Sequence, residues 1–172
     1  MTVIELDEDL YLAVAEATKV SREFFRPPVD CSTDKRYMGF AGEAAASIFL
    51  TGSDAAFRKT WQTLDETPDT PDLLDFPEIE VKTVLDLERP HFAIGNGFSQ
   101  EVKATNYLVI RQLAIVRFQV EGWLPADQVT PLWKAAGEPR FPSGTPILPC
   151  SVLRSSMSCP WRRRDVATPE AG

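Results

Sequence analysis

The segment from Asp75 to Lys82 brings acidic and basic side chains close together. If residues 79–84 form a β-strand, Glu80 and Lys82 share one face, because side chains alternate between the two faces of a strand. A turn at Pro77 would fold Asp75 back toward Glu80. Two carboxylates held together repel each other unless a cation lies between them, and hard oxygen ligands suit Mg²⁺ or Mn²⁺. The spacing therefore predicts a metal site with a lysine beside it.

A lysine next to such a metal has two chemical uses. Lys82 would orient or deprotonate the water that attacks a phosphodiester bond, or it would stabilise the charge that develops on the phosphate. The same residues also fit a simpler interpretation, a solvated strand face with a surface ion pair between Glu80 and Lys82. Such a pair would contribute little to stability.

A third carboxylate comes from a helix expected over residues 32–50. A rotation of about 100° per residue predicts an apolar face for this helix; it comprises Phe40, Ala41, Ala44 and Ile48. Glu43 lies about 60° from Phe40, at the border of that face. The alanine-rich stretch allows close approach to a sheet, so Glu43 would reach a metal held by Asp75 and Glu80. The alternative is a glutamate on the exposed edge of the helix.

Taken in order, these segments resemble the PD-(D/E)XK nuclease superfamily, which has a restriction-endonuclease-like fold. The resemblance rests on Gly39-Phe40-Ala41-Gly42-Glu43 in a helix, Asp75, Glu80-Val81-Lys82 in a strand, and an exit Gly122-Trp123-Leu124-Pro125. It spans roughly residues 37–129. The order of the parts is similar to that of small phage- or prophage-type nuclease-like proteins.

The resemblance implies Mg²⁺-dependent (or Mn²⁺-dependent) hydrolysis of DNA and a role for each residue. Asp75 and Glu80 would be metal ligands, Glu43 an auxiliary carboxylate at the metal, and Lys82 the catalytic lysine. The Pro71-Asp72 pair competes with Asp75 for the aspartate of the motif. We prefer Asp75 because four residues separate it from Glu80, which suits a tight turn.

Positive charge that would meet a phosphate backbone is scattered along the chain. Lys103, Arg111 and Arg117 are scattered candidate contacts, and residues 162–164 add a run of arginines to an expected mobile tail over 162–172. The net charge of −7 argues against passive coating of nucleic acid, because that binding depends on Lys and Arg. This argument does not apply to an enzyme that binds phosphate through a divalent cation.

The elements that must position these residues are helices followed by strands. Periodicity predicts helices over residues 5–25, 32–50 and 55–64, and then strands over 73–75, 78–84, 91–94, 107–112 and 115–122. Pro125 would occupy the first position of a short helix. The expected fold is one α/β domain, bordering on α+β, over residues 1–161, with a mixed sheet of about four to five strands preceded by helices.

Composition and motifs exclude several classes of protein. No apolar run reaches the ~18 residues of a membrane span, so we expect a cytoplasmic protein with no membrane partner. The three cysteines show no zinc spacing and are expected to be reduced thiols. A single histidine, His91, argues against a Ser-His-Asp hydrolase and a histidine zinc site. The glycines of residues 95–97 predict a turn between strands, not a phosphate-binding loop.

Two alternatives to a DNA nuclease stay open at this stage. One is a binding or assembly module that keeps the nuclease-like fold without catalysis, and the other is a nuclease that acts on RNA. Many restriction-like proteins dimerise to cut both strands, so a homodimer is a further possibility that the resemblance leaves open.

Overall fold

A computed structural model describes residues 2–24, 33–63, 71–88, 90–94 and 105–162 of the 172-residue chain. Helices and strands alternate in blocks along these ranges. In chain order they are β1 (Thr2–Glu5), α1 (Glu8–Phe24), α2 (Thr33–Thr51), α3 (Ala55–Gln62), β2 (Ile79–Leu85), β3 (His91–Ala93), β4 (Asn106–Ala114), β5 (Arg117–Pro125), α4 (Ala126–Ala135) and β6 (Ile147–Pro149).

The main sheet is mixed and has four strands in the order β1-β5-β4-β2. Strand β2 runs parallel to β4, whereas the β4–β5 and β1–β5 pairs are antiparallel. The short strands β3 and β6 form a separate antiparallel pair. This arrangement confirms the expected α/β class, and among the described residues no strand lies on the other side of β2.

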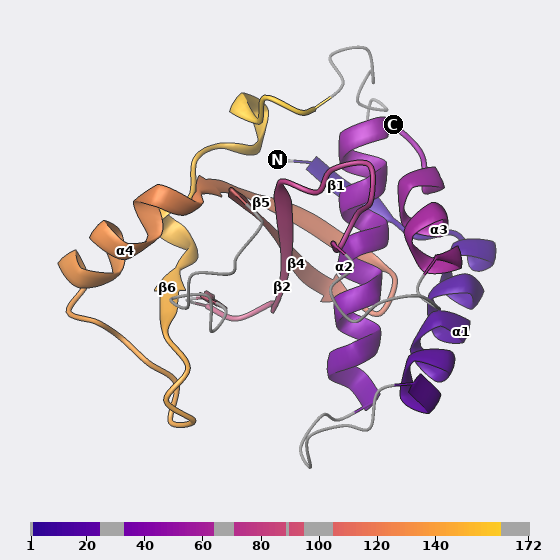
Figure 1. The fold of residues 1–172 in the computed structure, drawn as a ribbon, viewed down its shortest axis with the longest axis horizontal. Coiled ribbons are helices and arrows are strands. Elements are labelled where there is room, and N and C mark those ends of the chain that lie inside the picture. Colours follow the sequence, from indigo (N-terminus) through magenta and orange to yellow (C-terminus); the bar gives the residue numbers. More distant parts are fainter. Residues whose placement is uncertain (1, 25–32, 64–70, 89, 95–104, 163–172) are drawn as a thin grey trace.

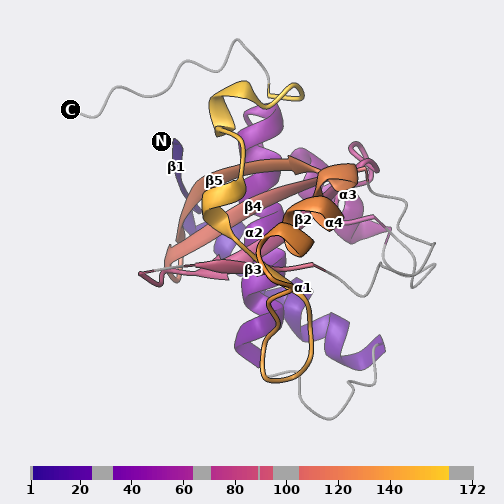
Figure 2. The ribbon, with the colours of Figure 1, turned by 90° about the vertical axis from the view of Figure 1, so that its left-hand side faces the viewer.

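Apolar side chains fill both faces of the main sheet. Helices α1, α2 and α3 cover one face, and α4 with the β3–β6 pair covers the other (Figures 1 and 2). Ile79 and Val81 of β2 belong to the core under α2, whereas Val84 belongs to the opposite core. The alternation expected for β2 is therefore confirmed, and Glu80 and Lys82 lie on the Val84 side of the strand.

Helix α2 lies unusually close to β2 at Gly42. A Cβ atom built on Gly42 would lie 1.8 Å from Thr83 Oγ1 and 3.0 Å from Thr83 Cβ. Glycine is required here by the close approach of the helix backbone to the Thr83 side chain, and the neighbouring small residues Ala41, Ala45 and Ala46 are buried. This contact brings Glu43 to the edge strand.

The first element differs from the expected one, which was a helix starting at residue 5. Residues 2–5 instead form β1, which pairs with β5, and α1 begins only at Glu8. Asp7 Oδ1 accepts the Leu10 N–H at 2.8 Å and so caps the helix. A four-residue edge strand carries too little alternation to be separated from the helical pattern that follows it.

The strand expected over residues 73–75 is also wrong. The Phe76 N–H donates to the Leu73 carbonyl at 2.9 Å, which closes a turn. The Leu74 N–H donates to Thr60 Oγ1 of α3 at 2.8 Å. The segment therefore satisfies its backbone groups through a turn and a helix side chain instead of a neighbouring strand.

Three smaller expectations can be compared with the structure. The expected position of Pro125 is wrong by one residue: its extended conformation makes it the residue before α4, and the helix continues past Pro131 to Ala135. Cys150 and Cys159 are free thiols, as expected, while Cys31, the turn at residues 95–97 and the tail 163–172 lie outside the described residues. Within the described ranges, no helix has the length and apolar character needed to cross a membrane.

Candidate functional site

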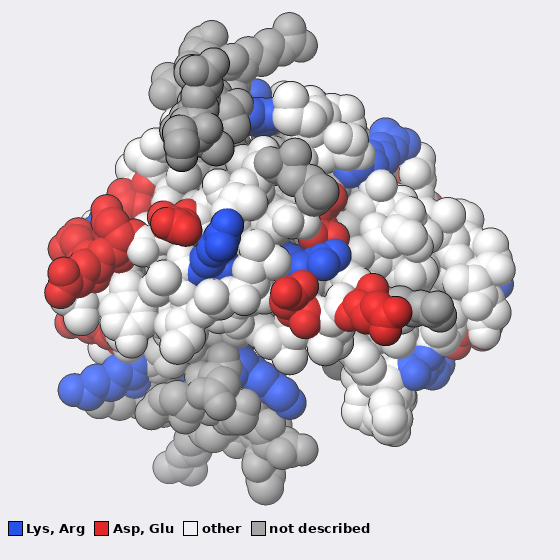
Figure 3. All heavy atoms as spheres, turned by 180° about the vertical axis from the view of Figure 1, so that it is seen from behind, with Lys and Arg blue, Asp and Glu red and all other residues white. Residues whose placement is uncertain are grey.

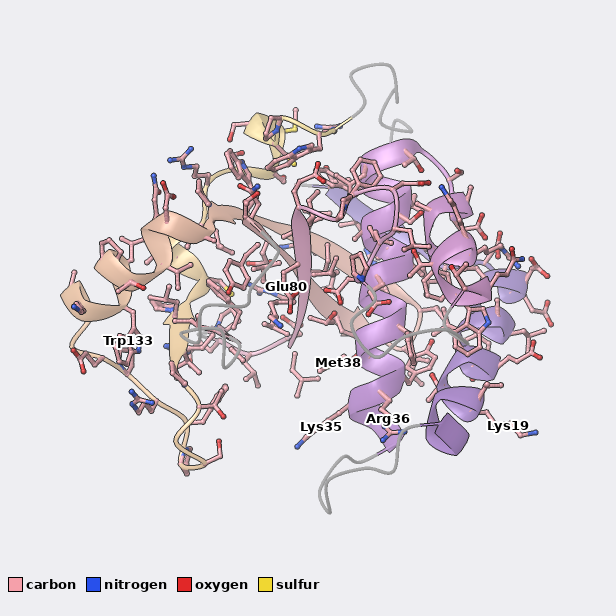
Figure 4. All side chains as sticks on the ribbon, in the orientation of Figure 1. Lys19, Lys35, Arg36, Met38, Glu80 and Trp133 are labelled. Atoms are coloured by element: carbon pink, nitrogen blue, oxygen red, sulfur yellow. The ribbon has the colours of Figure 1, made fainter. Side chains whose placement is uncertain are left out.

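Four charged side chains gather at the free edge of β2, and we call them the edge cluster: Glu43, Asp72, Glu80 and Lys82. Lys82 Nζ donates to Glu80 Oε1 at 2.5 Å. The Glu43 carboxyl is close enough to the other three for their charges to alter its pKa. Figure 4 shows Glu80 on β2, on the side of the strand away from α2. A helix, a turn and a strand thus each contribute to one site.

Asp72 is held in the edge cluster by the backbone of the strand. Its Oδ2 accepts the Val81 N–H at 2.7 Å. In the described part of the chain β2 pairs only with β4, and this N–H points away from β4, so no described strand accepts it. The Asp72 carboxylate therefore provides the hydrogen-bond acceptor for the Val81 N–H, and this bond holds it beside Glu80.

The electrostatics of the edge cluster show an excess of negative charge. Burial raises the pKa of Glu43 well above its usual value, and Asp72 and Glu80 raise it further, while Lys82 lowers it. Burial, then repulsion by Glu80, raises the pKa of Asp72 to about 6, against the Val81 hydrogen bond and Lys82. One ammonium group does not compensate three carboxylates at this edge.

Lys82 itself stays a cation. Burial lowers its pKa, but the charge of Glu80, the hydrogen bond to Glu80 and the charge of Asp72 outweigh burial and leave the pKa raised. An ammonium group of this kind donates hydrogen bonds and stabilises negative charge, and it is a poor proton acceptor.

Tyr107 is a neighbour of the edge cluster that the sequence did not indicate. It lies directly opposite Glu80 in the parallel β2–β4 register, so the two side chains share a face of the sheet. Its ring packs against Phe92 with centroids 6.2 Å apart, and the residue is 5% exposed. Burial raises the pKa of Tyr107, Lys82 lowers it and Glu80 raises it, which places the phenol near both charges.

Three of the four predicted site residues meet, and the fourth does not. Glu43, Glu80 and Lys82 lie together as expected, but Asp75 is 42% exposed in its side chain and forms an ion pair with Lys59 of α3. The prediction for Asp75 assumed a strand that turns back on β2. Because residues 73–76 form a turn instead, the competing Asp72 is the aspartate that reaches Glu80.

Arg111 and Arg117, two of the residues expected to contact phosphate, already form ion pairs within the protein. Arg111 Nη2 binds Glu121 Oε2 at 2.7 Å, its Nη1 lies 3.3 Å from Asp86 Oδ1, and its side chain is 21% exposed. Arg117 Nε lies 3.6 Å from Glu5 Oε1. Neighbouring carboxylates therefore already compensate both charges, and Lys103 lies outside the described residues.

Other basic side chains lie at the same end of the helical layer, near the start of α2 and toward the end of α1. Lys35 and Arg36 extend from α2, whereas Lys19 points outward from the far side of α1 (Figure 4), and none of the three forms an ion pair with another described residue. Acidic side chains gather elsewhere, over the region of α1 and the preceding strand (Figure 3). The exposed ones from the end of β1 to the middle of α1 are Glu5, Asp7, Glu8, Asp9 and Glu16.

The donor set of the edge cluster fits a hard divalent cation. Among the described residues, no group of three or more His, Cys, Asp or Glu side chains has the mutual geometry of a metal site. Mg²⁺ is commonly held by one or two carboxylates, with water and substrate phosphates completing its coordination. Two carboxylates are therefore enough for the protein's share of a Mg²⁺ site, and Asp72 and Glu80 would provide them.

No protein-family model, curated protein or solved structure matches the chain at a significant level. The geometry of the edge cluster is therefore the basis for a functional conclusion. The resemblance to PD-(D/E)XK nucleases stays a prediction.

The raised pKa of Asp72 predicts how stability changes with pH. A carboxyl whose pKa is higher in the folded state stabilises the fold below its unfolded pKa of 3.8, and this stabilisation is lost as pH rises through about 6. Asp72→Asn keeps an acceptor for the Val81 N–H but carries no charge. Without divalent metal, we expect the free energy of unfolding of the wild type to fall by up to about 3 kcal/mol relative to that of Asp72→Asn between pH 4 and pH 7.5.

Urea unfolding in a chelating buffer at several pH values measures this difference. A stability difference between the two proteins that does not change with pH would contradict the assignment of Asp72 to a charged, partly buried cluster.

Proposed function

We propose that this protein is a Mg²⁺-dependent nuclease that hydrolyses phosphodiester bonds in DNA. The observation that carries the proposal is the edge cluster, in which three carboxylates converge on one lysine at the free edge of a strand. The charge imbalance supports it, because a divalent cation would compensate the carboxylates that Lys82 leaves uncompensated.

Each residue of the edge cluster has a place in this proposal. Asp72 and Glu80 would hold the cation, and Glu43 would orient the water molecules or the phosphate beside it. When bound, the cation supplies Lewis-acid polarisation of a phosphoryl oxygen. The Val81 N–H keeps the Asp72 carboxylate oriented before any ligand binds, which lowers the cost of ordering the site.

Lys82 would act as a cation and not as a base. Its raised pKa supports this choice between the two uses considered from the sequence. With the charge of Glu80 compensated, the Lys82 ammonium would be free to donate to the attacking water or to a phosphate oxygen. Charge that develops on the phosphate in the transition state would then be stabilised at short range.

Replacement of Lys82 tests the proposal directly. We expect Lys82→Ala to reduce cleavage by about 100- to 1000-fold, because a preorganised donor to the developing charge is lost. The binding of Mn²⁺, followed by calorimetry, should persist or tighten in this variant, since Lys82 no longer competes for Glu80. The substrates are labelled single-stranded DNA, duplex DNA and RNA of matched sequence.

Lys59→Ala is the matched control, because Lys59 is an exposed lysine that also pairs with a carboxylate. It should cleave like the wild type. Cleavage by Lys82→Ala at the wild-type rate would exclude the proposed role of Lys82, and preferential cleavage of RNA would change the substrate from DNA to RNA.

A non-catalytic binding or assembly module is the second candidate. One observation favours it: Lys82 already donates a hydrogen bond to Glu80 Oε1. An ion pair of this kind can hold an edge strand in shape without any chemistry. A folded wild type that neither binds Mn²⁺ nor cleaves any of the three substrates would establish this alternative.

A further inference from the structure

We infer that the nucleic acid backbone approaches the edge cluster along the exposed face of α2 that carries Lys35 and Gly39, with Lys35 as a phosphate contact. This inference rests on the proposed nuclease function and adds to it a binding surface. The surface consists of Lys35, Met38 and Gly39, and we call it the α2 track.

Helical geometry aligns the α2 track with the site. At about 100° per residue, Gly39 lies about 40° and Glu43 about 80° around the helix from Lys35. The axial distance from Lys35 to Glu43 is about 12 Å at 1.5 Å per residue. This is roughly three to four base-pair steps of 3.4 Å, so Lys35 would contact a phosphate a few nucleotides from the bond that is cut.

Gly39 leaves room on this face. Among the described residues, a Cβ atom built on Gly39 has no heavy atom within 4 Å, whereas one built on Gly42 meets Thr83. A glycine within a helix costs about 1 kcal/mol of helix stability relative to alanine, and no packing contact in the described protein explains the cost at Gly39. Open backbone next to a charged site is suited to close approach of a bulky polyanion.

The charges around the α2 track favour a polyanion at this end of the molecule. Figure 4 shows Lys35 and Met38 extending from α2 toward the side on which Glu80 lies, with Arg36 at the same end of the helix. Lys35 is exposed and forms no ion pair with another described residue. The exposed acidic residues at the start of α1 would repel the same backbone, so the start of α2 is the favoured approach.

The test measures the salt dependence of binding, which a purely structural role of Lys35 would not alter. Labelled duplex and single-stranded oligonucleotides are titrated by fluorescence anisotropy with Mg²⁺ present. All variants carry Lys82→Ala so that the oligonucleotide is not cut. We expect Lys35→Ala to make the slope of log affinity against log salt shallower by about 0.9 for duplex or about 0.7 for a single strand.

Two further variants complete the design. Lys134→Ala removes an exposed lysine on α4 and should leave the slope unchanged. Gly39→Gln places a neutral side chain in the open space and should weaken binding several-fold at every salt concentration while the thermal unfolding midpoint does not fall.

The outcomes separate this inference from the proposed function. If the wild type cleaves DNA but Lys35→Ala binds with an unchanged slope, or with the same change as Lys134→Ala, the α2 track is wrong and the nuclease proposal stands. Unweakened binding by Gly39→Gln also overturns the α2 track. If the wild type neither binds nor cleaves nucleic acid, both proposals fail.

Discussion

Asp72→Asn is expected to lower cleavage by about 100-fold or more, whereas Asp75→Asn should leave it nearly unchanged. The two changes are chemically identical and lie three residues apart. Asp72 accepts the Val81 N–H and feels the charge of Glu80, while Asp75 is exposed and pairs with Lys59 on α3. The position of each carboxylate, and not its residue type, determines the expected effect.

The measurement is the rate of Mg²⁺-dependent cleavage for the two variants, together with Mn²⁺ affinity by calorimetry. Asp72→Asn should lose affinity for the cation, because a neutral amide is a weaker ligand than a carboxylate. Asp75→Asn serves as the matched control and loses only a surface ion pair, which contributes at most about 1 kcal/mol. The reverse result, with Asp75→Asn inactive and Asp72→Asn active, would restore the aspartate preferred from the sequence.

The choice between these aspartates shows where local pattern stops being informative. Alternation along residues 79–84 correctly assigned Glu80 and Lys82 to one face, and helical spacing correctly placed Glu43 beside the buried face of α2. The conformation of residues 72–76 depends on contacts with distant parts of the chain, namely Thr60 of α3 and the free N–H of Val81. No periodicity in the segment itself reports those contacts.

Tyr107 and Lys35 illustrate the same limit in two other ways. Tyr107 reaches the site because β4 runs parallel to β2 in a particular register, and a register between strands joined by a long connection has no local signature. Lys35 could be placed on the same side as Glu43 from helical geometry alone. Only the structure singles it out as a candidate phosphate contact. Arg111 and Arg117 form ion pairs with carboxylates, whereas Lys35 forms none with another described residue.

The second large effect is expected at the contact that positions α2. Gly42→Ala should destabilise the protein by about 1–2 kcal/mol, although alanine is the better helix former by about 1 kcal/mol. The added methyl group would lie 1.8 Å from Thr83 Oγ1, 3.0 Å from its Cβ and 3.2 Å from its Cγ2. Rotation of the threonine side chain moves Oγ1 and Cγ2 but leaves the close contact with Cβ. The helix or the strand must therefore move.

Movement at Gly42 should affect chemistry as well as stability, because Glu43 follows it directly and Lys82 precedes Thr83. A displacement of about 1 Å is expected to reduce cleavage by about 100-fold. Gly39→Ala, in the same helix, is the control for stability: it meets no described atom and should stabilise the protein by about 0.5–1 kcal/mol. Urea unfolding of the two variants, with cleavage rates for Gly42→Ala, measures both effects. If Gly42→Ala proved as stable and as active as the wild type, α2 would not need its close approach to β2, and the edge cluster would not depend on that contact.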